Sequence, residues 1–235
     1  MPPRPTKFEG RKKRYAIAIS LGVVVVSIAA YLAAEPPYKN SQTWSFDQYT
    51  IQTYDTNISP DGFQALITGS GEKGEWIIIN EKSAPSAPNI LAHLSLNASG
   101  SGYPVLIAMD KKYSDFKATL KFKIVGGEEN QVAGIAFRVL DKKHYYALAV
   151  DALNDRITLF RVSPDIILGI SETKVELSKD EWHTLVVEVF KTGMFGYLDG
   201  EQLIKRHDKE YSNGYLGVWT KNDSEVYFDD LKIEY

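Results

Sequence analysis

Hydrophobic and polar residues alternate along most of the chain after residue 43, with the two-residue period of strands that bury one face. No segment of this region shows a sustained helical period. Between residues 63 and 205 the pattern predicts strands at Phe63–Thr68, Glu75–Asn80, Pro104–Met109, Phe116–Val125, Val132–Leu140, Tyr145–Asp151, Arg156–Val162, Trp182–Phe190, Phe195–Leu198 and Gln202–Lys205. Asp199-Gly200 lies between the last two strands, where this dipeptide is typical of a two-residue hairpin.

The last 22 residues predict two further strands joined by a polar turn at 222–224. In the second strand the apolar positions shift parity across Asp229-Asp230, as a β-bulge requires. Many antiparallel strands without helices predict an all-β protein, a two-sheet antiparallel jelly-roll sandwich spanning residues 43–235. About two hundred residues in one sandwich can bury a stable core without disulfides, and the chain has no Cys.

Strand parity also predicts a candidate ligand face. If the bulky apolar residues of three strands point into the core, their other positions form a floor of Gly and Ala walled by polar and aromatic side chains. An aromatic ring can stack on a sugar while charged groups bind its hydroxyls. The candidate ligand-binding residues are Arg138, Tyr145, Asp151, Tyr215, Trp219 and Lys221. The alternative is an ordinary curved sheet on which Arg138 and Asp151 form a surface ion pair.

The N-terminal region predicts a membrane anchor. Residues 15–34 carry no charge and are long enough to cross a bilayer, and Arg11–Arg14 precedes them. We therefore expect a short basic cytoplasmic tail (1–14), a transmembrane helix (15–34), a short linker (35–42) and an extracytoplasmic domain (43–235) of a single-pass cell-membrane protein. A cleaved signal peptide is the alternative, because Ser27–Ala29 weakly matches a cleavage site.

Charge excludes nucleic acid as a partner. The chain has 27 basic and 30 acidic residues, of which six basic and one acidic lie in residues 1–14, so the remainder carries 21 against 29. Nucleic-acid recognition requires a basic footprint that this balance lacks. Outside the cell, Asn57, Asn97 and Asn222 begin sequons that permit glycosylation, although such short motifs also occur by chance.

Asp229 and Asp230 form the candidate metal site. A bulge can direct both carboxylates to one point, and their oxygens are the hard ligands that calcium prefers. The alternative is that they accept backbone hydrogen bonds locally. The four His residues show no zinc-ligand spacing, and no other cofactor is expected.

A series of short motifs runs through the predicted domain. In order, they are Trp44–Asp47, Ser114–Phe116, Val132–Arg138, His144–Leu148, Trp182-His183, Tyr197–Gly200, Gly214–Thr220 and Phe228–Leu231. This series resembles the concanavalin A-like and laminin G-like superfamily. The closest resemblance is to the domain of unknown function 1080, the 3-keto-disaccharide hydrolase domain, which is loosely similar to family 16 glycoside hydrolases. The resemblance implies the sandwich fold and leaves enzyme activity open.

Family 16 enzymes present their catalytic carboxylates as Glu-x-Asp-x-x-Glu, a spacing this chain does not contain. The sequence thus favours a membrane-anchored domain that binds a glycan. The alternatives are a glycoside-cleaving enzyme of the 3-keto-disaccharide hydrolase type and a structural or protein-interaction module that binds other cell-envelope proteins.

Overall fold

The computed structural model describes residues 38–235 except 55–59, 71–74, 95–100 and 165. The predicted tail, the predicted transmembrane helix, and the sequons at Asn57 and Asn97 lie outside the described residues. Within the described ranges, no helix has the length and hydrophobicity that a membrane span requires.

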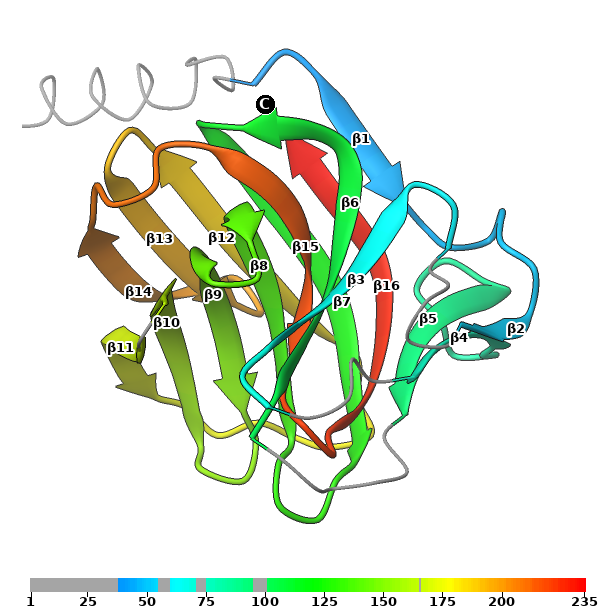
Figure 1. Cartoon of the computed structure of the whole chain (residues 1–235). Helices are drawn as coiled ribbons and strands as arrows, with labels where there is room; N and C mark the ends of the chain where they lie inside the picture. The colour runs from blue at the N-terminus through cyan, green and yellow to red at the C-terminus, as the bar shows by residue number, and fades with distance from the viewer. Residues whose placement is uncertain (1–37, 55–59, 71–74, 95–100, 165) are drawn as a thin grey trace, which may run out of the picture. The chain divides into compact units, whose positions relative to one another are not determined.

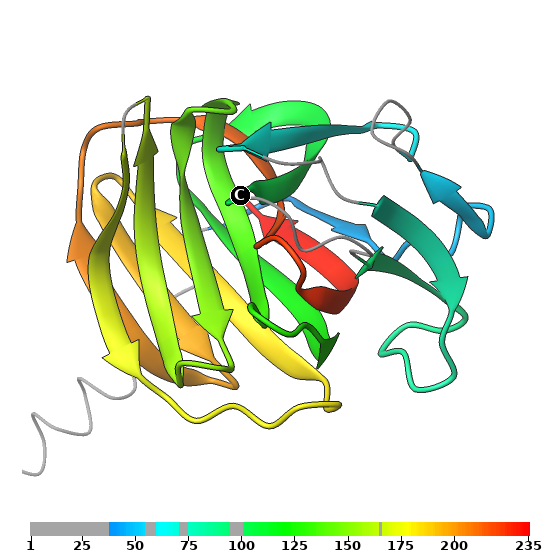
Figure 2. The same ribbon diagram turned by 60° about the horizontal axis from the view of Figure 1, so that its bottom comes forward.

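Two antiparallel sheets pack face to face in the described part of the chain (Figures 1 and 2). In the larger sheet, β1 pairs with β16 and the other strands follow the order β14-β13-β12-β7-β16-β5-β4-β2. Its strands are β1 (Ser41–Trp44), β2 (Gln52–Tyr54), β4 (Glu75–Asn80), β5 (Asn89–Leu94), β7 (Phe116–Gly126), β12 (His183–Phe190), β13 (Gly193–Leu198), β14 (Glu201–His207) and β16 (Glu225–Glu234).

The smaller sheet has the order β11-β10-β9-β8-β15-β6-β3. Its strands are β3 (Phe63–Thr68), β6 (Tyr103–Tyr113), β8 (Val132–Asp141), β9 (His144–Asp151), β10 (Arg156–Ser163), β11 (Ile166–Lys174) and β15 (Gly214–Thr220). Both sheets are antiparallel, pack face to face and pair strands that are distant in sequence, as the strands of a jelly roll do. The predicted all-β jelly-roll sandwich is therefore confirmed. β1 begins two residues before the predicted domain start.

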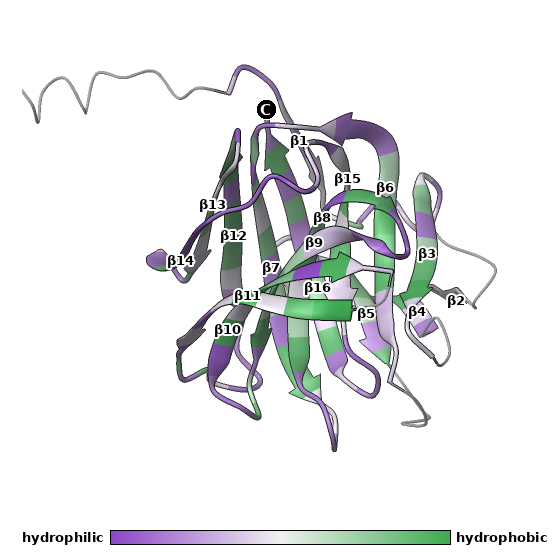
Figure 3. Ribbon diagram, turned by 60° about the vertical axis from the view of Figure 1, so that its left-hand side comes forward, coloured by the Kyte–Doolittle hydropathy of each residue, from purple (hydrophilic) through white to green (hydrophobic). Residues whose placement is uncertain are grey.

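Hydrophobic residues from both sheets fill the space between them. In Figure 3, hydrophobic bands alternate with polar bands along the strands of the larger sheet, as their two-residue period requires. The core contains large fully buried side chains from both sheets, including Trp76, Phe122, Phe137, Tyr146 and Phe228.

Sequence pattern did not identify β1, β2, β5 and β11. β5 lies between β4 and β16 and is buried on both faces, so its hydrophobic residues do not alternate with polar ones. β11 is an edge strand whose register shifts opposite Leu159–Phe160. This shift breaks its alternation and leaves Ile166 and Leu168 exposed.

Two predicted local features are confirmed. Asp199 and Gly200 both have positive φ (49° and 88°) and join β13 to β14 as a two-residue hairpin. The pairing of β16 with β7 shifts register between Asp229 and Lys232, and Asp230 has a φ of 45°, so the predicted bulge lies at this pair.

Candidate ligand site on the outer face of the seven-stranded sheet

The predicted floor of small residues exists on the face of the smaller sheet that points away from the core. Trp219 of β15 lies opposite Gly134 of β8, which lies opposite Ala149 of β9. In the adjoining row, Gly217 lies opposite Ala136, and Ala136 lies opposite Ala147. A side chain at Gly134 would approach the Leu148 carbonyl oxygen to 2.7 Å, so glycine is required there.

The Trp219 ring covers this floor and is itself covered. It stacks on Tyr103 of β6 at 5.1 Å and on Phe160 of β10 at 5.6 Å between ring centroids, and only 1% of it is exposed. β10 lies three strands from β15, about 14 Å away in a flat sheet at a spacing of about 4.8 Å. The sheet must therefore curl to bring these rings together, and its outer face is concave. Figure 1 shows the strong bend of β6 and β15.

Tyr145 lies beneath the same aromatic layer. The Trp219 indole N–H donates to the Tyr145 hydroxyl at 3.2 Å, which shares a hydrogen bond of 2.7 Å with the Thr68 hydroxyl, and Thr68 donates to the Lys142 carbonyl. Burial raises the pKa of Tyr145 to about 12. Trp219 and Tyr145 occupy the predicted face, but neither is open to solvent, which corrects the expectation of an outward stacking aromatic.

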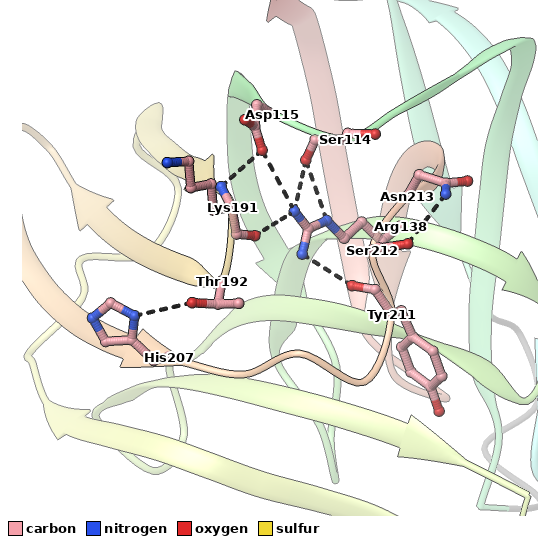
Figure 4. Close-up of polar contacts among 9 residues, drawn as sticks. All are labelled: Ser114, Asp115, Arg138, Lys191, Thr192, His207, Tyr211, Ser212 and Asn213. Carbon is pink, nitrogen blue, oxygen red and sulfur yellow. Dashed lines mark hydrogen bonds and ion pairs between the residues drawn. The ribbon is translucent and has the colours of Figure 1, made fainter.

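Arg138 does not line this face. It has a positive φ of 49° and lies where the pairing of β8 with both neighbours shifts register, so the parity that predicted its direction does not apply. Its guanidinium donates to the carbonyl oxygens of Ser114, Lys191 and Tyr211 at 2.8–3.2 Å, as Figure 4 shows. Its Nη2 also lies 3.8 Å from a carboxylate oxygen of Asp115. Arg138 holds three loops together, so the prediction that it points to the outer face is wrong.

Asp151 and Lys221 lie at the margin of the face. Asp151 accepts hydrogen bonds from the backbone N–H and side-chain amide of Asn154 and pairs with Arg156 at 3.4 Å, so it closes the turn after β9. The alternative ion pair between Asp151 and Arg138 is therefore absent. Lys221 follows β15 and begins a turn in which its carbonyl accepts hydrogen bonds from Ser224.

The open part of the concave face surrounds Tyr215, the one predicted aromatic that remains half-buried. A cavity of about 280 Å3 lies beside it, lined by Gln64, Leu66, Ile107, Met109, Leu140, Asp141, Lys142 and Tyr215. The ammonium group of Lys112 lies 5.3 Å from the centre of the Tyr215 ring. Residues 140–143, which we call the hairpin tip, lie where β8 turns into β9, and the first three of them form one wall of this cavity.

A second cavity of about 290 Å3 lies on the other side of the hairpin tip. Its lining residues are Ile67, Thr68, Gly69, Lys142, Lys143, Ser163, Pro164, Ile166 and Ile167. Lys142 lines both cavities. Sequence reasoning missed the hairpin tip, although the run Asp141-Lys-Lys143 between two strong strand signals marked an exposed polar turn.

Asp141 and His144 form a hydrogen-bonded pair at this turn. The His144 Nδ1 lies 2.8 Å from the Asp141 carboxylate, which also accepts the Lys143 backbone N–H at 2.7 Å. Partial burial opposes ionisation of Asp141, but these hydrogen bonds outweigh it and lower the pKa of the carboxyl group. Asp141, which lines the cavity beside Tyr215, is therefore ionised at neutral pH.

Asp229 has local partners in the larger sheet. Its carboxylate accepts hydrogen bonds from the Ser86 backbone N–H and hydroxyl, each at 2.8 Å, and from the Asp230 N–H. It thereby ties the loop after β4 to β16, and burial raises its pKa to about 6. Among the described residues, no group of three or more His, Asp or Glu side chains is placed to hold a metal ion. Calcium binding by Asp229 and Asp230 stays a prediction.

Comparison with known proteins shows both a family and a fold. The family model described as the 3-keto-alpha-glucoside-1,2-lyase-like domain matches residues 59–234. Carbohydrate-binding module CBM66 from Bacillus subtilis is similar in structure, with a TM-score of 0.59 and 21% identity over 74% of this chain and 96% of that one.

A GH16 protein of the Bacteroides ovatus mixed linkage glucan PUL, solved in complex with its G4G4G3G product, is also similar in structure. Its TM-score is 0.53 at 9% identity, over 77% of this chain and 99% of that one. No curated protein sequence matches the chain. At these identities, the similar structures establish the sandwich fold alone.

Proposed function

The chain belongs to the 3-keto-alpha-glucoside-1,2-lyase-like family, and from that premise we propose that it binds a glycan at the cavity beside Tyr215. The observation that carries the proposal is the position of Tyr215. It is half-buried on a concave face and lines a cavity, while Trp219 and Tyr145 on the same face are buried. A half-buried ring can still offer its surface to a sugar.

The polar lining of the cavity supports the same proposal. Gln64 offers an amide, Asp141 a carboxylate and Lys142 an ammonium group, and these are the donors and acceptors that sugar hydroxyls require. Leu66, Ile107 and Met109 add the apolar contact typical of ligand sites. A volume of about 280 Å3 lies near the lower end of ligand pockets, roughly 300–1,000 Å3, so the cavity suits a short stretch of saccharide.

Glycan-array screening of the full-length protein, followed by calorimetry on the hits, tests this proposal. We expect Tyr215→Ala to weaken binding about tenfold, which corresponds to about 1.4 kcal/mol. The matched control is Tyr227→Ala. Tyr227 is also half-buried and also lies 5.3 Å from a lysine ammonium, but it belongs to the larger sheet. Equal binding by the two variants would contradict the proposed site.

Family membership supports a second candidate, cleavage of a 3-keto-glycoside. A 1,2-lyase removes a proton from C2 of the sugar while the leaving group departs from C1, so it needs a base. If His144 donates Nδ1–H to Asp141, its Nε2 is left to accept that proton. Product formation from a 3-keto-disaccharide, abolished by His144→Gln in a protein that still binds the sugar, would establish this activity. Product formation unchanged in His144→Gln would exclude His144 as the base.

The glycan is proposed to lie outside the cell, with residues 15–34 as the anchor, because the basic residues before that uncharged span favour a cytoplasmic N-terminus. Protease added to spheroplasts should then digest the domain, and the protein should fractionate with membranes before digestion. Release of a soluble form that begins near residue 30 would instead indicate a cleaved signal peptide.

A further inference from the structure

Three lysines lie in or beside the two cavities that flank the hairpin tip. Lys112 lies over the Tyr215 ring, Lys142 lines both cavities, and Lys143 lines the second. All three are exposed. In the described part of the chain, none of them takes part in an ion pair, so their charges remain available to a ligand.

The nearby negative charge does not neutralise these lysines. Asp141 is the only carboxylate among the described residues that line either cavity. Its oxygens are bound by the His144 ring and the Lys143 backbone N–H. Beside Tyr215, Lys142 and Lys112 therefore face one anion whose hydrogen-bonding capacity is already partly used, and Lys143 adds a third cation in the second cavity.

This local excess runs against the composition of the chain. After residue 14, acidic residues outnumber basic ones by 29 to 21, so a random surface region would be acidic. Like charges gathered at one site repel one another, and a bound anion removes that repulsion. The grouping is best explained by a ligand that brings negative charge.

We infer that the glycan held beside Tyr215 is anionic and carries a carboxylate, as uronic acids do, which the Lys142 ammonium binds while the sugar ring stacks on Tyr215. This inference rests on the proposed function. Lysine supplies a flexible point charge with three donors, which suits a carboxylate on a sugar ring that can bind in more than one orientation. The hydrophobic lining contacts the ring, and the lysines contact its charge.

A matched pair of ligands tests the inference. Tetragalacturonate and its fully methyl-esterified form share one backbone and differ in charge. We expect the acid to bind the full-length protein at least tenfold more tightly than the ester at low salt. Because exposed charges are screened at high ionic strength, this advantage should shrink several-fold when salt is raised to about 0.5 M.

Lys142→Gln should remove most of the difference between acid and ester, because it takes away the positive charge that favours only the acid. Lys205→Gln is the matched control, because Lys205 is also exposed but belongs to β14 of the larger sheet. It should leave both affinities unchanged. Inorganic phosphate should not compete with tetragalacturonate at concentrations near the affinity of the acid, since a bare anion lacks the ring.

The outcomes separate the inference from the proposed function. Equal binding of acid and ester, both weakened by Tyr215→Ala, would overturn the anionic ligand and keep the glycan site. A glycan array on which only neutral sugars bind would do the same. An array without any bound glycan would overturn both the anionic ligand and the glycan site. Competition by phosphate with the same affinity as tetragalacturonate would show that the site binds anions in general and does not recognise a sugar.

Discussion

Trp219 and Tyr215 lie on the same strand, point to the same face of the same sheet, and have different environments. Trp219 is almost completely buried between Tyr103 and Phe160, and its N–H is bound by Tyr145. Tyr215, four residues earlier, is half-buried beside a cavity and a lysine. Parity places both rings on one face, but the curvature of the sheet decides which of them a ligand could reach.

The difference lies in the neighbours across the concave face. Opposite Trp219, the floor residues are Gly and Ala, so aromatic rings from distant strands can lie over them and close the space. Opposite Tyr215 stands Val139, and the hairpin tip rises beside it. That end of the face therefore stays open. A concave sheet thus contains a packed aromatic layer and an accessible cavity within one strand length.

The largest expected effect is that of Trp219→Ala on stability. Removing a buried tryptophan should lower the free energy of unfolding by about 3–5 kcal/mol, because the cavity left behind cannot close completely. Urea unfolding followed by circular dichroism measures it. An unchanged midpoint would show that the ring is not packed, and the contrast with Tyr215 would fail.

A smaller effect is expected from Tyr145→Phe. Loss of this hydroxyl leaves the buried N–H of Trp219 without its acceptor, which should cost about 1–3 kcal/mol at neutral pH. Thr68→Val removes the next hydroxyl of the same chain. Because the two changes interrupt one hydrogen-bonded network, their effects in a double variant should not add. Additive losses would show that the network does not act as a unit.

The same hydroxyl gives a pH-dependent test. Burial raises the pKa of Tyr145 to about 12, against about 10 for an unfolded tyrosine. Between these values the unfolded state loses the proton and the folded state keeps it, so stability falls as pH rises from about 10 to about 12. Tyr145→Phe lacks this loss, and the stability difference between wild type and variant should shrink over that range. A constant difference would argue against burial of the hydroxyl.

The smallest stability effect is expected from Tyr215→Ala. Because the ring is only half-buried and lines a cavity, its removal should cost less than about 1 kcal/mol. The same urea experiment measures it beside Trp219→Ala. A loss as large as that of Trp219→Ala would show that both rings are structural and that the cavity is not a binding surface.

The sequence by itself determined the fold class, most strand positions and two local features. Alternation is a short-range property, so β3 and β4 could be predicted to the residue. Asp199-Gly200 and the Asp229–Asp230 bulge were also predictable, because positive φ and a parity shift leave local signals. The family resemblance, carried by the order of the motifs, was likewise contained in the chain and is confirmed by the family match.

The tertiary structure alone decided which side chains are accessible. The bulge at Arg138 turned a predicted ligand residue into a link between three loops, and the curl of the smaller sheet buried Trp219 and Tyr145. Lys142 lines the candidate site beside residues of β3, β6 and β15, which lie far from it in sequence. Alternation reports which face of the sheet a residue occupies. Its exposure depends on strands that come together only when the sheet curves, and no short stretch of sequence encodes how close those strands come.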